Sequence, residues 1–131
     1  MNKLKVICNR FIPFPGFTAM QLFGIIFRRQ EYCGMQISKR TYNHELIHLY
    51  QALDFVWGCK KLQFLGFIFF YIWYLIEWLI KLIMSIFTLG YIKAYRSISF
   101  EIDAYENELD YTYCETRKKF SWIKNVFKVR K

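Results

Sequence analysis

The fold depends on one long apolar stretch, residues 62–92, which reads LQFLGFIFFYIWYLIEWLIKLIMSIFTLGYI. Its only charged residues are Glu77 and Lys81. Lysines and arginines flank it on both sides, and tryptophans and tyrosines lie along it, as aromatic side chains do at membrane interfaces. A chain of 131 residues can hardly cover so long an apolar helix on all sides. The stretch therefore predicts a membrane helix or a re-entrant block.

Polar and small residues recur within this stretch at intervals that place them on one stripe of a helix. They are Gln63, Gly66, Tyr74, Glu77, Lys81, Ser85 and Thr88. Glu77 and Lys81 stand four residues apart, in the favourable order for a helical ion pair. Two interpretations are open. The pair can snorkel and ease the helix into lipid, or the stripe can face the protein interior.

The composition of the whole chain indicates a membrane partner. Hydrophobic residues make up 55% and aromatic residues 21%, and the net charge is +9. So apolar a chain is not disordered, and its length allows one domain. A basic, aromatic chain binds nucleic acid or a membrane surface. Because bulky apolar residues interleave with the basic ones, we expect a lipid bilayer as partner and no nucleic acid.

We expect the protein at the cytoplasmic (inner) membrane, integral or deeply monotopic. Asn9 and Arg10 interrupt the first apolar run, so a cleaved secretory signal is not predicted. The four cysteines are far apart and form no CxxC pair. In a reducing compartment we expect all four to be free thiols.

The chain divides into five segments of a single membrane-associated domain, and the predicted fold is a mostly α membrane protein of about three helices with a short N-terminal β-hairpin. The segments are 1–40 (a basic arm and β element), 41–57 (a helix), 62–92 (the apolar stretch), 99–116 (an acidic helix) and 117–131 (a basic amphipathic tail). The prolines and glycine at 13–16 predict a turn, and 17–29 predicts a strand that pairs with 35–38. Thr41 or Asn43 is the expected N-cap of the first helix. The basic tail has the composition of a segment that lies on anionic lipid.

The two histidines of the chain lie in one motif, His44-Glu45-Leu46-Ile47-His48. Positions i and i+4 of a helix point the same way, so both imidazoles can bind one metal ion. Glu45 projects from the adjoining side, where it can take a proton from a water that zinc makes more acidic. The motif predicts zinc as cofactor, His44 and His48 as ligands, and Glu45 as the catalytic residue.

A catalytic zinc needs a third protein ligand and an open position for water. The chain has no third histidine, so we expect a carboxylate from the acidic segment. Glu101, Tyr105 and Glu108 share one face of a helix there. Glu101 and Glu108 are therefore both candidates for the third ligand.

HExxH followed by Glu-x-x-Ala at 101–104 resembles the gluzincin metallopeptidases. It is most similar to the membrane-bound CAAX-prenyl-protease and β-lactam sensor-transducer types, and also to small uncharacterised bacterial membrane proteins. The resemblance covers about 41–57 and 98–110, and it implies Glu101 as third ligand and Glu45 as general base. The aspartate that follows the alanine in those families orients a ligating histidine, but here it is Tyr105. Asp103 or Glu108 would have to substitute for it.

The length of the apolar stretch restricts where such a site can form. A straight helix over 62–92 would be about 46 Å long, against about 30 Å for the hydrocarbon core. A single crossing would place His48 and Glu101 at opposite faces of the bilayer. A shared site therefore requires the chain to return, through a bent block or through a neighbouring helix that dips into the bilayer.

The predicted function is a membrane-associated zinc metallopeptidase-like protein that hydrolyses a peptide bond. The expected substrate is a peptide or protein, to which residues 17–29 would offer an edge strand. Tyr105, Tyr111 and Arg96 are unranked candidates for stabilising the oxyanion. Two non-enzymatic alternatives are a small membrane protein with a structural metal site and a lipid-surface adaptor that binds through the basic tail.

Overall fold

The computed structural model describes residues 3–12 and 17–131, and most of this chain is helical. Its α-helices are α1 (Lys39–Asp54), α2 (Gln63–Phe87), α3 (Ser99–Asn107) and α4 (Tyr113–Thr116). Its strands are β1 (Lys5–Asn9), β2 (Ala19–Leu22) and β3 (Ile25–Arg29). Short 3-10 helices are η1 (Gln30–Tyr32), η2 (Lys60–Leu62), η3 (Tyr95–Ser97) and η4 (Ser121–Asn125). The prediction of a mostly α protein with a small β element is confirmed at this level.

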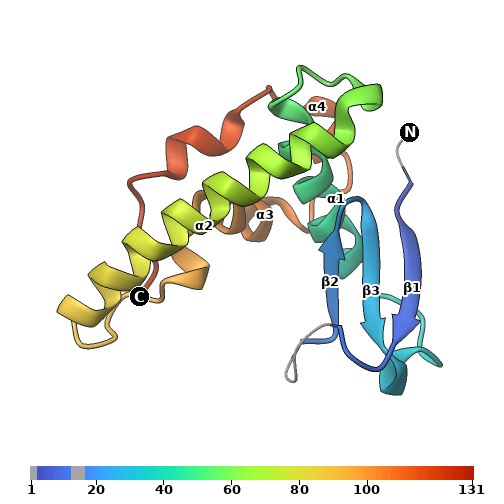
Figure 1. The fold of residues 1–131 in the computed structure, drawn as a ribbon, viewed down its shortest axis with the longest axis horizontal. Coiled ribbons are helices and arrows are strands. Elements are labelled where there is room, and N and C mark those ends of the chain that lie inside the picture. Colours follow the sequence, from blue (N-terminus) through green and yellow to red (C-terminus); the bar gives the residue numbers. More distant parts are fainter. Residues whose placement is uncertain (1–2, 13–16) are drawn as a thin grey trace.

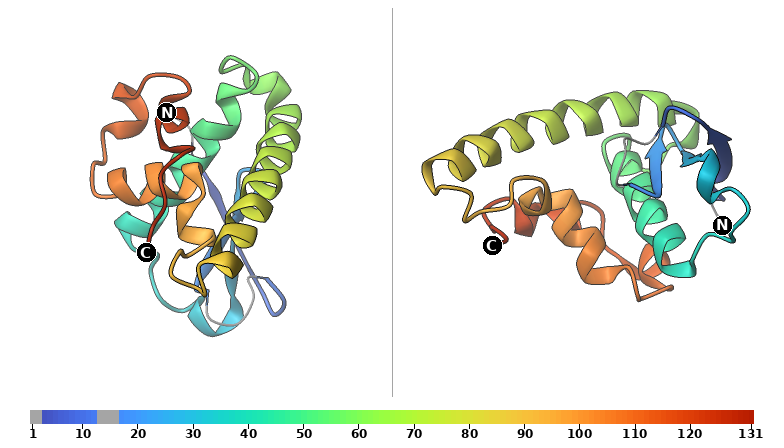
Figure 2. Two further views of the ribbon diagram at one scale, coloured as in Figure 1. Left: turned by 90° about the vertical axis from the view of Figure 1, so that its left-hand side faces the viewer. Right: turned by 90° about the horizontal axis from the view of Figure 1, so that it is seen from below.

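Helix α2 extends along one side of the molecule, and the other helices and the sheet all pack on the same side of this helix (Figures 1 and 2). Within the described part of the chain, one helix, Lys60–Phe87, is long and apolar enough to cross a membrane. Helix α2 itself ends at Phe87 rather than at 92. The chain turns there because Leu89 and Gly90 both adopt positive φ, which a continuing helix does not allow.

The small sheet has the strand order β1-β3-β2. β2 pairs antiparallel with β3, with Gln21 opposite Ile26, and β1 pairs parallel with β3 on its other side. The predicted pairing of 17–29 with 35–38 is therefore wrong. Both hairpin strands lie within 17–29, and 35–38 lie outside the sheet. β2 is left at the edge of the sheet.

The turn between β2 and β3 explains why a single strand over 17–29 was predicted instead of a hairpin. Phe23 and Gly24 form a two-residue loop with φ of 51° and 82°, the backbone of a type I′ hairpin. Phenylalanine rarely adopts this conformation. Here its ring stacks on Phe64 and packs edge-on against Tyr71, whose hydroxyl accepts the Phe23 amide. Contacts with α2 thus hold a turn that local propensity does not favour.

Strand β1 comes from the segment predicted as an extended arm, and the turn predicted at 13–16 lies outside the described residues. Cys8 of β1 forms a disulfide with Cys33, with a Cα–Cα distance of 6.0 Å. The expectation of four free thiols is therefore wrong for this pair, whereas Cys59 and Cys114 are free. The parallel pairing of β1 with β3 brings the two cysteines together, and their spacing of 25 residues gives no sign of it.

Helix α1 begins earlier than predicted. Its N-cap is Ser38, whose Oγ accepts the Thr41 amide at 3.0 Å, so the predicted caps Thr41 and Asn43 lie inside the helix. At the other end, Gly58 (φ 80°) donates its amide to the Leu53 carbonyl at 2.8 Å. This closing bond is the C-terminal signal predicted from the glycine.

The polar stripe of α2 faces protein, as the second interpretation has it. Glu77 is buried and accepts hydrogen bonds from the Ser99 amide at 2.8 Å and the Ser99 hydroxyl at 2.6 Å. Lys81 is buried and donates to the carbonyls of Val126 at 2.8 Å and Lys128 at 2.6 Å. The two charged side chains therefore bind different partners rather than each other.

The acidic segment forms two helices rather than one helix over 99–116. Helix α3 ends at Asn107, and Asp110 then accepts the Thr112 amide at 3.0 Å and the Thr112 hydroxyl at 2.7 Å. Such local side-chain bonds compete with a continuing helix. The basic tail, 117–131, is not an amphipathic α-helix. It runs beside α2, where Trp122 of η4 packs against Trp73.

Helix α2 packs closely against helix α1 near its N-terminal end. At Gly66 of α2, an added Cβ would lie 2.5 Å from the carbonyl oxygen of Ala52 in α1. Glycine therefore allows close contact between the two helix backbones. This packing places Phe70 of α2 beside His48 of α1.

We expect Gly66→Ala to lower the free energy of unfolding by about 1–3 kcal/mol, because the methyl group forces the two backbones apart. Gly34→Ala is the matched control, since a Cβ there meets nothing within 4 Å. Denaturant unfolding of detergent-solubilised protein measures both. Equal stability of the two variants would contradict the close contact.

Candidate metal centre

Three buried side chains from two helices meet at one point. His44 and His48 lie one turn apart on α1, and Glu101 faces them from the first turn of α3. The Nε2 atoms of the two histidines are 3.2 Å apart. Each oxygen of Glu101 lies 3.4 Å from one of these nitrogens. The structure thus brings together the three residues predicted as ligands, and this group could hold a metal ion.

The spacing of the donor atoms fits a bound ion. Zinc bonds of about 2.0–2.2 Å in a tetrahedral arrangement separate neighbouring ligand atoms by about 3.3–3.6 Å. The two imidazole nitrogens lie close to this spacing, and each is 3.4 Å from a different oxygen of Glu101. Among the described residues, Glu101 Oε2 is one of the buried side-chain atoms with no hydrogen-bond partner. A buried, unpaired carboxylate oxygen is costly unless a cation is near. Two imidazoles and a carboxylate are a donor set that several transition metals accept.

The outer nitrogen of His44 is held by Glu108. The His44 Nδ1 lies 3.0 Å from Glu108 Oε2, and the other oxygen of Glu108 accepts from the Arg40 guanidinium. A carboxylate can only accept, so Nδ1 carries the proton and the Nε2 lone pair is directed at the cluster. Glu108 therefore contacts the far side of the ring, and Glu101 is the carboxylate placed as third ligand. Glu108 takes the orienting place that Tyr105 leaves open.

The outer nitrogen of His48 is held by Gln51, which the sequence analysis missed. The Gln51 amide group donates to Asp103 Oδ2 at 3.0 Å and to the Phe100 carbonyl at 3.1 Å. Its oxygen must then face His48 Nδ1, 2.8 Å away, so that nitrogen carries the proton. Asp103 thus orients His48 through Gln51. The spacing of Gln51, three residues after His48 on the same helix face, was the available signal.

Glu45 lies beside the cluster and is fixed by the edge strand. Its Oε2 accepts the backbone amide of Gln21 at 3.1 Å, and its carbonyl accepts the Gln21 side-chain amide at 2.9 Å. Glu45 lines the same pocket as His48 and Glu101. Gln21 could not be predicted from the sequence, because its contact with Glu45 depends on the position of β2 beside α1.

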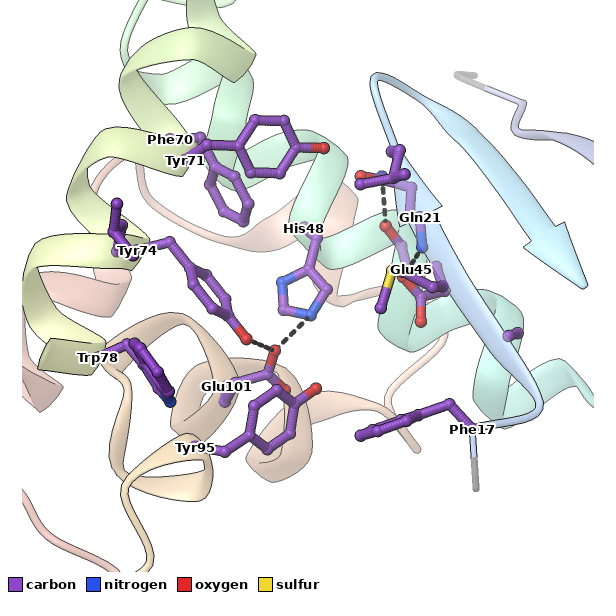
Figure 3. Close-up of a pocket in the computed structure, with 14 residues that line it drawn as sticks. Phe17, Gln21, Glu45, His48, Phe70, Tyr71, Tyr74, Trp78, Tyr95 and Glu101 are labelled. Carbon is purple, nitrogen blue, oxygen red and sulfur yellow. Dashed lines mark hydrogen bonds and ion pairs between the residues drawn. The ribbon is translucent and has the colours of Figure 1, made fainter. Parts of the chain in front are cut away.

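A cavity of about 430 Å³ opens beside the cluster (Figure 3). One wall is β2, and the other is the aromatic face of α2, including Phe70, Tyr71 and Trp78. The lining is mostly apolar, and the side chains of Glu45, His48 and Glu101 bring polar groups together at one point of it. This is the usual composition of a binding site with a few convergent polar groups.

The tyrosines around the cluster differ from those predicted. Tyr105 packs edge-on against His44 with ring centroids 4.7 Å apart, and the Arg96 guanidinium stacks on Tyr105 at 5.1 Å. Tyr111 is exposed. The three predicted oxyanion candidates therefore lie outside the lining of the pocket, which instead includes Tyr74 and Tyr95. Tyr74, whose hydroxyl donates to Glu101 at 3.1 Å, belongs to the polar stripe recognised in the sequence.

Burial and mutual attraction shift the acid–base properties of the cluster. Burial raises the pKa of Glu45, although His48 and His44 oppose this. Burial alone would lower the pKa of His48, but the adjacent Glu101 carboxylate raises it to about 9. Burial would raise the pKa of Glu101, but the two imidazoles hold it well below its usual range. Without a metal, a protonated His48 therefore faces an ionised Glu101.

No protein-family model, no curated protein and no solved structure matches this chain. The predicted resemblance to gluzincins therefore rests on the sequence elements HExxH and Glu-x-x-Ala alone.

We expect His48→Ala to abolish metal binding, because it removes a donor atom, and Glu101→Gln to weaken it strongly, because it replaces a charged oxygen donor by a neutral amide. Glu108→Gln keeps all three donors but loses the charge that orients His44, so affinity should fall by about 10–100-fold. Glu115→Gln, on the exposed surface of α4, is the control. Titration of purified protein against a competing zinc chelator gives the affinities. Full zinc occupancy in His48→Ala would exclude this site.

Metal affinity should rise with pH up to about 9, because His48 must release its proton before Nε2 can bind an ion. Below that pH, displacement of one proton predicts an increase of about tenfold in apparent affinity for each pH unit. Above it, the affinity should level off. Chelator competition at several pH values between 7 and 10 measures this, with the chelator's own protonation taken into account. An affinity that does not change from pH 7 to 9 would contradict it.

Proposed function

We propose that this chain is a membrane-associated, zinc-dependent hydrolase of gluzincin type that cleaves a peptide bond. One observation carries the proposal: the Glu45 carboxylate lines the same pocket as His48 and Glu101, beside the convergent ligand atoms. Bound zinc would supply a Lewis acid that polarises a substrate carbonyl and makes a water more acidic. His44, His48 and Glu101 would hold it.

Glu45 is the general base of this proposal. Burial raises its pKa, which makes the carboxylate a stronger proton acceptor than an exposed glutamate. The Gln21 amide holds one carboxylate oxygen in place, which leaves the other to accept the proton. Glu45 would then deliver that proton to the leaving amine.

The edge of β2 supports a peptide as substrate. The Gln21 amide bonds to Glu45, so it points away from β3 and toward the pocket. In an antiparallel pair, backbone groups of alternate residues face the same side, so those of Ala19 share this direction. An extended peptide can add to such an edge through main-chain hydrogen bonds. That arrangement would lay its backbone along the ligand cluster.

The pocket also argues against a purely structural metal. Structural zinc sites are closed by four protein ligands, whereas catalytic sites keep a position open. The cluster found among the described residues consists of three ligands, and a cavity adjoins it. A structural site also has no need of an acid between its two histidines.

We expect Glu45→Gln to retain zinc and stability while hydrolysis falls by about 10²–10⁴-fold, because the amide keeps the hydrogen bond from Gln21 but cannot accept a proton. Hydrolysis is measured with a mixture of fluorogenic peptides, and zinc by elemental analysis of the same sample. Glu115→Gln is again the control for charge. Loss of zinc from Glu45→Gln with retention in Glu101→Gln would reverse the assigned roles. A parent protein that holds zinc but cleaves no peptide would favour the structural site.

A further inference from the structure

We propose that α2 lies in the plane of an anionic bilayer instead of crossing it, and that the pocket opens there to apolar peptide segments embedded in the lipid. The docking rests on the surface of α2 and the positive charge of the chain, and it does not rest on zinc binding or hydrolysis. The substrate class rests on the proposed hydrolase function.

The side of α2 turned away from the protein is apolar and exposed along the whole helix. This outer face consists of Phe64, Leu65, Phe69, Ile72, Leu75, Ile76, Leu79, Ile80, Ile83, Ile86 and Phe87. Single exposed apolar residues are ordinary, but a continuous exposed strip of this kind marks an interaction surface. Leu65, Ile76 and Ile83 are spaced so that they share one line along the helix. They are 41%, 53% and 54% exposed.

The opposite side of α2 is covered by the rest of the protein, which carries charged side chains and argues against a crossing. Glu77 and Lys81 bind segments from α3 and the basic tail. If α2 stood upright in the bilayer, these segments would have to enter the hydrocarbon beside it. Lys118 and Lys124 of the tail are exposed, and charged side chains at that depth are strongly unfavourable. A helix that exposes one apolar side and packs its other side against a charged protein body instead lies flat at the interface.

Charge selects an anionic bilayer over a second copy of the chain. The net charge is +9, so two copies repel each other, whereas a surface of anionic lipid attracts them. Lys60 and Lys61 stand at the start of α2, and the basic tail runs beside it. Each basic residue near such a surface adds to the binding.

The pocket reaches this same outer face. Leu75 both lines the pocket and is 55% exposed, so the pocket wall and the outer face share a side chain. Phe17, on the other side of the pocket, is also partly exposed. With α2 flat in the lipid, the opening lies at the level of the acyl chains. Apolar segments could then reach β2 and the ligand cluster without passing through water.

Depth measurements distinguish the flat helix from a crossing. Nitroxide labels are placed at Leu65→Cys, Ile76→Cys and Ile83→Cys in a Cys59→Ser background, with Glu115→Cys as the water-exposed control. The protein is bound to vesicles of phosphatidylglycerol and phosphatidylcholine. Accessibility to oxygen and to an aqueous nickel complex gives each depth. We expect equal depths, about 5–10 Å below the headgroups, at all three α2 positions.

Three other outcomes would overturn the docking. A crossing would place the labels at 65 and 83, about 27 Å apart along the helix, near opposite interfaces, with the label at 76 deepest. Labels that stay in water would exclude lipid as the partner. Strong dipolar coupling between labels on different molecules would indicate a second copy on the outer face. None of these readouts depends on zinc or hydrolysis, so the docking and the proposed function can fail separately.

The substrate class is tested with one cleavable sequence presented in two ways, either free in solution or continuous with an apolar segment inserted in the vesicle. The embedded form should be cleaved at least tenfold faster at equal concentration. Leu75→Ser should raise the apparent KM for the embedded form, whereas the matched variant Ile83→Ser, equally exposed but distant in sequence from the pocket lining, should not. Equal cleavage of both forms, or equal effects of both variants, would refute access from the lipid. If neither form is cleaved, the hydrolase function fails and the depths still decide the docking.

Discussion

The burial of one polar stripe of α2 is the constraint on which the rest of the structure depends. A carboxylate and an ammonium group cannot remain unpaired in an apolar helix, so the chain must bring partners to them. Ser99 reaches Glu77, and carbonyls of the basic tail reach Lys81. The same stripe carries Gly66, where α1 approaches, and Tyr74, which bonds to Glu101. Satisfying these groups draws α1 and α3 to the same side of α2, where their functional side chains meet.

The candidate site was predictable where its geometry lies within one helix. His44, Glu45 and His48 follow from helical spacing alone, and the carboxylate from the acidic segment follows from the missing third histidine. Spacing alone leaves Glu101 and Glu108 open, because the choice depends on the relative position of two helices, and only the resemblance to gluzincins implies Glu101. In the structure the two carboxylates lie on different sides of the His44 ring. Glu108 contacts the outer nitrogen, Nδ1, and Glu101 faces the inner nitrogen, Nε2.

Prediction failed where tertiary contacts override local preference. Phe23 adopts a left-handed conformation because aromatic rings of α2 hold it, and no turn propensity indicates this. The pairing of β1 with β3 and the Cys8–Cys33 bond depend on strand order, which was invisible in the spacing of the residues. The acidic composition of 99–116 predicts one continuous helix, but composition does not show where a helix ends. Here α3 ends at Asn107, and Asp110 then bonds to the Thr112 amide in a local turn.

The bond from Ser99 to Glu77 also makes the start of helix α3 depend on α2. The N-cap of α3, Ile98, offers no side-chain hydrogen bond, and the carboxylate that accepts the Ser99 amide belongs to α2. A negative charge at a helix start stabilises it, and a helix of nine residues is marginal by itself. The contact with α2 therefore stabilises the start of helix α3, two residues before Glu101 in the chain. Of the three candidate ligands, the histidine pair depends on the geometry of α1 alone, whereas the position of Glu101 depends on the contact between α2 and α3. A metal ion held by all three residues would therefore require the completed fold.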